Sequence, residues 1–244
     1  MYHNIAEETG FNTVSTQNFI NHIKYLAEQN YNVVSFDLYT RLINENKLTP
    51  NTIALTFDDA YTSFAEIVIP VLERYRYPAI VFVPVGFVGK YNEWDQQFSD
   101  KKIPVLSWEK LKAITGNSLV TIGAHGFSHR PLSALSPDEI TYEIAESKKL
   151  IELELHTRVD YFSYPYGQYK HFNSFAVDCL REKGYKAACS TNWNNHNTAK
   201  SIFKLNRIEI EPGDTVAVFQ KKLKSKFHIK YFKQMVKNVL AKFS

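Results

Sequence analysis

Short apolar segments alternate with amphipathic helical segments along most of this chain, and this alternation constrains its fold more than any other feature. The segments 52–57 (TIALTF) and 79–83 (AIVFV) are rich in apolar and β-branched residues, as strands are when both faces of their sheet are covered. Helical segments separate the strands, so neighbouring strands need crossover connections and run parallel. The pattern predicts an α/β fold with a parallel sheet inside and helices outside, and these repeated units suit a barrel better than an open sheet. We expect strands at 31–35, 52–57, 79–83, 119–122, 161–164, 185–190 and 203–210, and helices at 17–29, 64–75, 136–155 and 173–183.

Size and composition restrict the classes of protein to which the chain can belong. Its 244 residues suit one barrel-sized domain. The two cysteines, Cys179 and Cys189, are too few for a disulfide scaffold, and no apolar stretch is long enough to span a bilayer. The first residues lack the basic start and apolar run of a signal peptide, which on sequence alone predicts a cytoplasmic protein, although a removed leader would leave the same pattern. We expect no nucleic-acid partner.

Positive charge is concentrated in the last part of the chain. Eight lysines and no acidic residue lie between Val216 and Ser244, so the remaining chain is acidic overall. Apolar residues recur in this segment at roughly helical spacing. We therefore divide the chain into a main domain at 1–215 and a basic amphipathic helical tail at 216–244. The simpler interpretation is a helix that packs on the domain and exposes its lysines, and the alternative is peripheral contact with an anionic membrane or an acidic partner.

Polar residues with catalytic chemistry follow three of the predicted strands. Asp58 and Asp59 follow the segment 52–57, His125 and His129 follow 119–122, and a Pro-Tyr-Gly turn follows 161–164. In parallel α/β folds the carboxyl ends of the strands meet at one edge, where reactive groups gather. Taken alone, the Asp pair also suits a helix cap and the His pair also arises by chance. Their shared position after strands favours a single site.

Two imidazoles and one carboxylate leave coordination positions open, which is typical of a catalytic metal centre. Adjacent residues of an extended segment point in different directions, so one Asp can bind the metal while the other, Asp58, accepts a proton from water. A divalent ion such as zinc would lower the pKa of its water and polarise an acyl oxygen. A backbone N–H in the turn 165–167 could stabilise the resulting oxyanion.

Three motifs resemble those of the polysaccharide deacetylase family, the NodB-homology carbohydrate esterases. The Thr-Phe-Asp-Asp motif of the family corresponds to 56–59, its His-x-x-x-His motif to 125–129, and its aromatic-Arg-x-Pro-Tyr-Gly motif to 162–167. The resemblance covers about residues 1–210, and the pattern is most similar to the branch of exopolysaccharide and biofilm deacetylases. It implies a distorted (β/α) barrel with seven parallel strands. It also implies an acetylated carbohydrate as substrate, most commonly the N-acetyl group of N-acetylglucosamine units.

The resemblance implies roles for individual residues. Asp59, His125 and His129 correspond to the metal ligands, with zinc as the expected ion and cobalt, nickel or manganese as alternatives. Asp58 corresponds to the general base, and the backbone N–H of Tyr166 corresponds to the oxyanion donor. Some relatives work outside the cytoplasm, so an extracytoplasmic location is the alternative to the location given above.

Two departures from the family pattern concern the base and the general acid. Ser163 stands where the third motif carries an Arg that orients the base. Arg207 is a candidate substitute, and we also count it among the candidate substrate-binding residues. The fifth motif of the family supplies a His as general acid, and the matching segment 205–210 has none. His3 is the candidate proton donor, with His196 as an alternative.

Aromatic and turn residues near the predicted site are candidates for sugar contacts. Trp94 lies in the long polar loop 86–104, Trp193 follows the segment 185–190, and Pro165 precedes Tyr166. Packing is the alternative role for each of them. Two other functions stay open: a non-catalytic carbohydrate-binding protein on a degraded deacetylase fold, which the departures suggest, and a hydrolase of small C–N substrates with the same fold.

Overall fold

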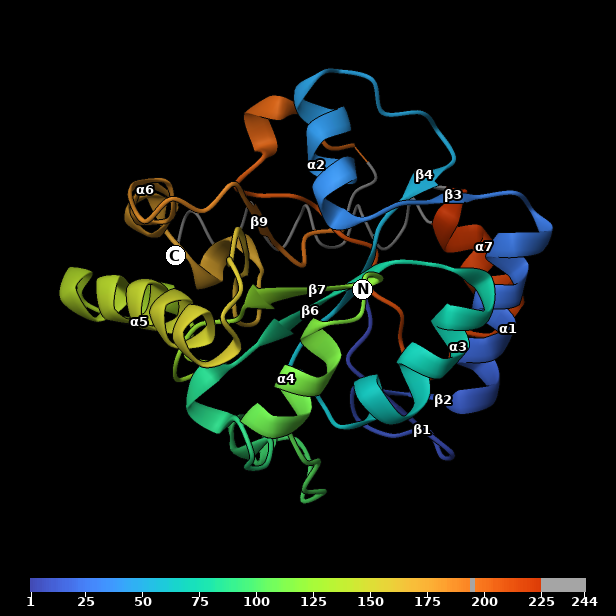
Figure 1. The fold of residues 1–244 in the computed structure, drawn as a ribbon, viewed down its shortest axis with the longest axis horizontal. Helices are drawn as coiled ribbons and strands as arrows, with labels where there is room; N and C mark the ends of the chain where they lie inside the picture. The colour runs from blue at the N-terminus through green and yellow to red at the C-terminus, as the bar shows by residue number, and fades with distance from the viewer. Residues whose placement is uncertain (194–195, 225–244) are drawn as a thin grey trace.

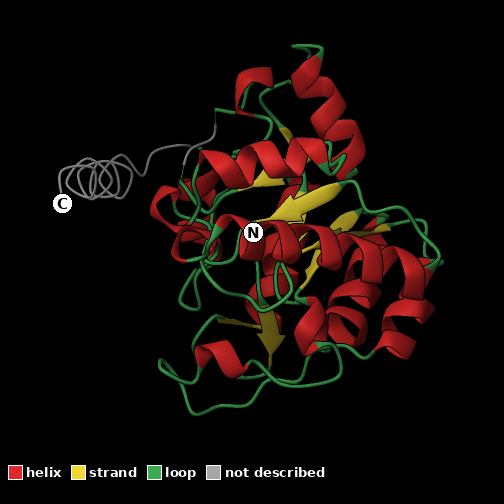
Figure 2. Ribbon diagram, turned by 90° about the vertical axis from the view of Figure 1, so that its left-hand side faces the viewer, coloured by secondary structure: helices red, strands yellow, loops and turns green. Residues whose placement is uncertain are grey.

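A five-stranded parallel sheet forms the centre of the computed structural model, which describes residues 1–193 and 196–224. The strands follow each other in chain order across the sheet. Figure 1 shows α2 above this sheet and α4 below it, and Figure 2 shows helices packed around the strands. The predicted α/β arrangement is therefore confirmed as a curled parallel sheet covered by helices. The strands are β5 Leu55–Phe57, β6 Ala79–Val83, β7 Val120–Ala124, β8 Tyr161–Ser163 and β9 Ala187–Cys189.

Two further pairs of short parallel strands are not strands of the central sheet, although Tyr2, shortly before β1, forms a parallel bridge with Phe57 of β5. β1 (Asn4–Ala6) pairs with β2 (Thr13–Ser15), and β3 (Asn32–Val33) pairs with β4 (Thr52–Ile53). In the part of the chain that the structure describes, the central sheet thus has five strands and not the seven that were expected. The five strands form a half-barrel, which is consistent with a distorted barrel.

The predicted strand at 203–210 is wrong. Only Leu205 forms a bridge with β9. The segment does not continue as a regular strand, although the backbone N–H of Arg207 still donates to the carbonyl of Asn192 (3.2 Å). The segment nevertheless lies against the edge of the sheet, and this position brings Arg207 into the centre of the molecule, where it is buried.

The helices begin where the sequence supplies capping side chains. Ser136 accepts a hydrogen bond from the N–H of Glu139, and the Glu139 side chain accepts one from the N–H of Ser136, which forms a capping box before the predicted long helix. Ser35 caps a nine-residue helix that the sequence analysis does not predict, and this cap ends the predicted strand 31–35 early. The helices are α1 Thr16–Glu28, α2 Phe36–Asn44, α3 Ile69–Tyr75, α4 Trp108–Thr115, α5 Pro137–Leu155, α6 Ser174–Glu182 and α7 Val216–Leu223.

The predicted helix at 64–75 has two parts. A π-helical turn at Phe64–Val68 precedes α3, and the N–H of Ile69 donates to the carbonyl of Phe64, five residues back. Pro70 follows at the start of α3 and has no N–H to give to the preceding turn. Such π turns are frequent near functional sites, and this one follows the Asp58-Asp59 pair closely in the chain.

Helix α7 packs against α1. Phe219 is buried and stacks on His22, with ring centroids 4.3 Å apart. Lys222 is also buried, and it pairs with Asp214 (2.5 Å) and Glu211 (3.0 Å). The rest of the predicted tail, from residue 225 onward, lies outside the described residues. The division at 215 and the contact with a membrane or acidic partner therefore stay predictions. No described helix has the length and apolar character needed to cross a membrane.

Candidate metal centre and active site

Three potential metal ligands converge beyond the carboxyl ends of β5 and β7. Asp59 follows β5, whereas His125 and His129 follow β7. Oδ1 of Asp59 lies 3.4 Å from Nε2 of His125 and 3.2 Å from Nε2 of His129. The three ligand atoms lie within 4.8 Å of one another, and all three side chains are buried. The structure therefore brings the predicted ligand set together.

The donor set fits a divalent cation. Oδ1 of Asp59 is buried and accepts no hydrogen bond from the described residues, although two imidazole nitrogens approach it. His125 donates from Nδ1 to the carbonyl of Ser163 (2.7 Å), which leaves its Nε2 lone pair directed at the centre. A cation among these atoms would satisfy the carboxylate oxygen and both nitrogens. Such a set also leaves positions for water and substrate, as catalytic zinc sites do.

Burial and mutual proximity set the protonation of these three groups. Burial acts to raise the pKa of Asp59, but the adjacent His125 and His129 outweigh it and hold that pKa well below its usual range. Burial lowers the pKa of His129, and the nearby carboxylate does not offset this. Burial acts in the same direction on His125, but the neighbouring carboxylates raise its pKa overall. An ionised Asp59 and a neutral His129 are the forms that bind a metal.

Asp58 is held by a buried arginine from a distant part of the chain. Arg207 donates through Nη1 and Nη2 to the two carboxylate oxygens, each at 2.7 Å. The hydroxyl of Ser163 donates to the same carboxylate (3.2 Å) and accepts from Nη2 of Arg207 (2.9 Å). Arg207 thus makes the contact expected of the missing third-motif Arg, beside the small Ser163. Burial acts to raise the pKa of Asp58, but Arg207 and then His125 lower it to about 2, so this carboxylate is ionised at neutral pH.

His3 and Tyr166 border the same site. The N–H of Asp58 donates to the carbonyl of Tyr2 (3.0 Å), which places the backbone of His3 beside it, and His3 helps to lower the pKa of Asp58. The ring of Tyr166 meets the ring of His129 edge to face, with centroids 5.1 Å apart. No acceptor among the described residues takes the backbone N–H of Tyr166. That N–H is therefore available to a ligand.

Three residues of the site have a left-handed backbone although they are not glycines. The φ angles are 73° at Asp59, 54° at His129 and 58° at Tyr166. Such conformations cost about 1–3 kcal/mol each and cluster at functional sites. Gly167 follows with φ 61°, and a Cβ added there would lie 2.6 Å from Cγ2 of Thr191, so the turn needs a glycine at this position.

The predicted sugar-binding residues occupy different environments. Trp94 stacks on His129, with ring centroids 4.4 Å apart, and so forms a wall of the metal centre. Pro165 and Trp193 are buried. The guanidinium of Arg207 already contacts Asp58. The structure therefore brings Trp94 and Arg207 to the centre, and direct sugar contact by all four residues stays a prediction.

Comparison with known proteins identifies the family. Residues 45–188 match the family model described as polysaccharide deacetylase. The chain belongs to the polysaccharide deacetylase family. It is 25% identical to YxkH of Bacillus subtilis strain 168 over 220 residues, which cover 90% of this chain and 73% of that protein. It is 27% identical to the poly-β-1,6-N-acetyl-D-glucosamine N-deacetylase of Escherichia coli K12, a match that covers 75% of this chain but only 32% of that protein.

Solved structures share the fold of this polysaccharide deacetylase. The Streptococcus pyogenes deacetylase PplD, in complex with acetate, superposes with a TM-score of 0.76 at 22% identity, covering 91% of this chain and 96% of that chain. IcaB from Ammonifex degensii superposes with a TM-score of 0.76 at 21% identity, covering 90% and 94%. At these identities the likeness establishes the fold. It agrees with the architecture that the sequence motifs predict.

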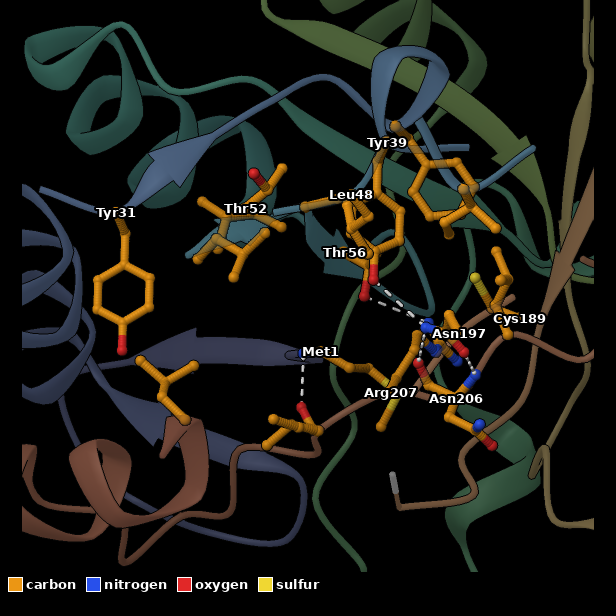
Figure 3. A pocket seen from close by; sticks show the side chains of 18 of the residues that line it. Met1, Tyr31, Tyr39, Leu48, Thr52, Thr56, Cys189, Asn197, Asn206 and Arg207 are labelled. Carbon is orange, nitrogen blue, oxygen red and sulfur yellow. Dashed lines mark hydrogen bonds between the residues drawn. The ribbon is translucent and has the colours of Figure 1, made fainter. Parts of the chain in front are cut away.

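A cavity in this polysaccharide deacetylase lies apart from the three candidate metal ligands. Its volume is about 460 Å³, and Figure 3 shows Arg207, Thr56 and Asn197 among the residues that line it. Nη1 of Arg207 donates to the Thr56 hydroxyl here (3.4 Å), and no candidate metal ligand lines the cavity. His196, the alternative proton donor, lines this cavity, whereas His3 lies beside Asp58. We therefore keep His3 as the candidate proton donor.

Sequence reasoning misses a buried acid in the loop 86–104. Asp95 follows Trp94 directly and accepts a hydrogen bond from the Tyr61 hydroxyl (3.2 Å). Burial, and next the charge of Asp59, raise the pKa of Asp95 to about 6. Asp95 could have been identified from the sequence, because it lies in a long loop next to Trp94, a predicted site residue.

A second missed residue, Glu143, lies on α5. It is buried and accepts hydrogen bonds from the loop between the two histidines. It shares a face of the helix with the buried Ile140, Ile144 and Ser147. Glu143 could have been identified from the sequence, because it is an acid at a position where the spacing of the predicted helix calls for an apolar residue.

Proposed function

We propose that this polysaccharide deacetylase is a divalent-metal-dependent hydrolase that removes N-acetyl groups from N-acetylglucosamine units of a polysaccharide. The supporting observation is the convergence of Asp59, His125 and His129 next to a second carboxylate, Asp58, that is held separately by Arg207. Zinc is the ion we propose, because two imidazoles and one carboxylate form a catalytic zinc set. Cobalt, nickel and manganese are the alternatives.

The partners of Asp58 suit it to the role of general base. An ionised carboxylate has about four acceptor positions. Arg207 uses two of them and Ser163 uses a third, which leaves one for a water molecule. When bound by Asp59 and the two histidines, a divalent ion supplies a water nucleophile at neutral pH and polarises the acetyl oxygen. Asp58 then needs only to accept the proton of the attacking water.

Two further groups complete the reaction. A bond forms between the water oxygen and the acetyl carbon, and the bond between that carbon and the sugar nitrogen breaks. The backbone N–H of Tyr166 would donate a hydrogen bond to the developing oxyanion. His3, beside Asp58, would donate a proton to the departing nitrogen. The products are acetate and a free amine on the sugar.

An exposed aromatic pair supports a polymer as the substrate. Phe11 follows β1, and Phe98 lies in the loop that carries Trp94. Their rings stack with centroids 5.4 Å apart, and both are exposed, at 39% and 55%. Aromatic faces of this kind bind the apolar faces of sugar rings. The Escherichia coli relative is a poly-β-1,6-N-acetyl-D-glucosamine N-deacetylase, which makes β-1,6-linked oligomers the first substrate to test.

The decisive experiment measures acetate release from a panel of acetylated compounds. The panel contains β-1,6-linked and β-1,4-linked N-acetylglucosamine oligomers, acetylated xylan fragments and small N-acetyl compounds. We expect release from N-acetylglucosamine oligomers that stops with chelator and returns with zinc. Asp138→Ala, which changes an exposed acid at the start of α5, is the matched control for Asp59→Ala.

The two alternative functions give different results in the same panel. A zinc-loaded protein that binds oligomers but releases no acetate would overturn the proposal and favour the non-catalytic carbohydrate-binding protein. Release from small N-acetyl compounds alone would favour the small C–N hydrolase. One motive for the non-catalytic alternative, the missing third-motif Arg, is weakened by the contact between Arg207 and Asp58.

A further inference from the structure

The loop between the two histidine ligands, residues 126–128, is held from α5 by one carboxylate. Oε2 of Glu143 accepts hydrogen bonds from the backbone N–H groups of Phe127 (2.7 Å) and Ser128 (2.9 Å). Oε1 accepts a third hydrogen bond from the Ser128 hydroxyl. Hydrogen bonds to an ionised acceptor are about twice as strong as neutral ones. Glu143 therefore restrains two successive backbone units of this loop.

The same loop is also held from the opposite direction by the turn that follows β6. The N–H of Val85 donates to the carbonyl of Gly126 (3.1 Å), and the N–H of Gly86 donates to the carbonyl of Phe127 (2.8 Å). Gly126 has φ 74°, and a Cβ added there would lie 3.1 Å from Oε2 of Glu143. The loop is thus packed between the turn after β6 and the Glu143 carboxylate, with little space to shift.

The two histidines differ in how their rings are oriented. His125 donates from Nδ1 to the Ser163 carbonyl, which is the usual outer hydrogen bond of a metal-binding histidine. Nδ1 of His129 is buried and has no hydrogen-bond partner among residues 1–193 and 196–224. The orientation of His129 is therefore set by its backbone, with φ 54°, and by the contacts of its ring with Trp94, Tyr166 and Asp59.

We propose that Glu143 is a positioning residue for the metal ligand His129, and that it acts by fixing the loop 126–128 and not by contact with the ring. The inference rests on the proposed function, because it assigns a role in the same metal centre. It accounts for a buried acid on the apolar face of α5 and for the absence of an outer hydrogen bond at His129.

Two substitutions of Glu143 separate its acceptor atoms from its shape. Glu143→Gln keeps one oxygen for the N–H groups of Phe127 and Ser128, and its amide can donate to the Ser128 hydroxyl. Glu143→Met has similar length but offers no such acceptor. The control is Glu146→Met on the same helix, where the acid is partly exposed and pairs with Lys149.

The experiment measures zinc affinity by competition with a chelator, the absorption spectrum of the cobalt-substituted protein, and amide hydrogen exchange in the metal-free protein. For Glu143→Met we expect about 10–100-fold weaker zinc binding, as for losses of other outer-shell partners. We also expect an altered cobalt spectrum and faster exchange at Phe127 and Ser128. Glu143→Gln and Glu146→Met should stay within about threefold of the wild type.

The outcomes separate this inference from the proposed function. Zinc affinity and a cobalt spectrum unchanged in Glu143→Met would overturn the inference while the metal centre stands. A wild-type protein that binds no zinc would overturn both. If Glu143→Met does not fold, Ser128→Ala takes its place, because this substitution removes one of the three hydrogen bonds to Glu143. Weaker zinc binding by Ser128→Ala than by the wild type then supports the inference. Equal zinc binding counts against it.

Discussion

Replacing Arg207 with methionine tests the buried ion pair that holds the candidate base. The pKa of Asp58 is about 2, against an ordinary 3.8. A shift of one pKa unit corresponds to about 1.4 kcal/mol. The ionised carboxylate therefore stabilises the folded state by about 2 kcal/mol, and this figure already includes the cost of its burial. Without Arg207 that burial cost is no longer offset. We therefore expect Arg207→Met to destabilise the protein by about 3–5 kcal/mol, as when one partner of a buried pair is removed.

The assay is urea unfolding of the metal-free protein at pH 7, with Arg74→Met as the control for loss of an exposed arginine. The double variant Asp58→Asn with Arg207→Met should recover a large part of the lost stability, because no unpaired charge stays buried. Two results would refute the reasoning. One is a loss in the free energy of unfolding below about 1 kcal/mol for Arg207→Met, and the other is an equal loss when Arg207→Met is made in the wild type and in Asp58→Asn.

The effect also has a defined pH dependence. The pKa of Asp58 in the folded state is lowered, so its contribution to stability is present above its unfolded value near 3.8 and is lost as the pH falls through about 2. In Arg207→Met no arginine offsets the burial of Asp58, and burial raises the pKa of that carboxyl. As the pH falls, Asp58 therefore becomes protonated at a higher pH in the variant, and the cost of burying an unpaired charge disappears. The difference in stability between wild type and variant should therefore be constant above the raised pKa of the variant, shrink as the pH falls below it, and be smallest near pH 2.

Three other substitutions test separate parts of the site. Asp59→Ala should abolish both zinc retention and acetate release, measured by metal analysis after dialysis, and an active metal-free variant would contradict the ligand assignment. His3→Gln should slow release from N-acetylglucosamine oligomers by about 10²–10⁴-fold but slow release from an aryl acetate far less, since that leaving group needs no proton; equal losses would argue against a proton donor. Phe98→Ala should raise KM for long oligomers and leave small acetylated substrates unchanged, and an equal change for both would exclude a platform for the polymer.

The site residues that could be predicted from the sequence are those that directly follow strands. Asp59, His125 and His129 each follow an apolar strand within a few residues, and parallel strands end at the same edge of a sheet, so their meeting follows from local pattern. The pairing of Arg207 with Asp58 was one of two interpretations left open, because 149 positions separate the two residues. The predicted strand at 203–210 was wrong for a related reason, since the extent of its pairing with β9, a single bridge at Leu205, depends on the packing of distant segments.

Periodic apolar strands and the polar residues just beyond them were enough to infer the family, the α/β architecture and the candidate metal ligands, since each is a relation between near neighbours in the chain. Packing of the whole molecule was needed to show that Arg207 holds Asp58, that Trp94 covers His129 and that Glu143 holds the histidine loop. Those contacts join distant segments, and a buried charge finds its partner only after the surrounding elements have packed and excluded water.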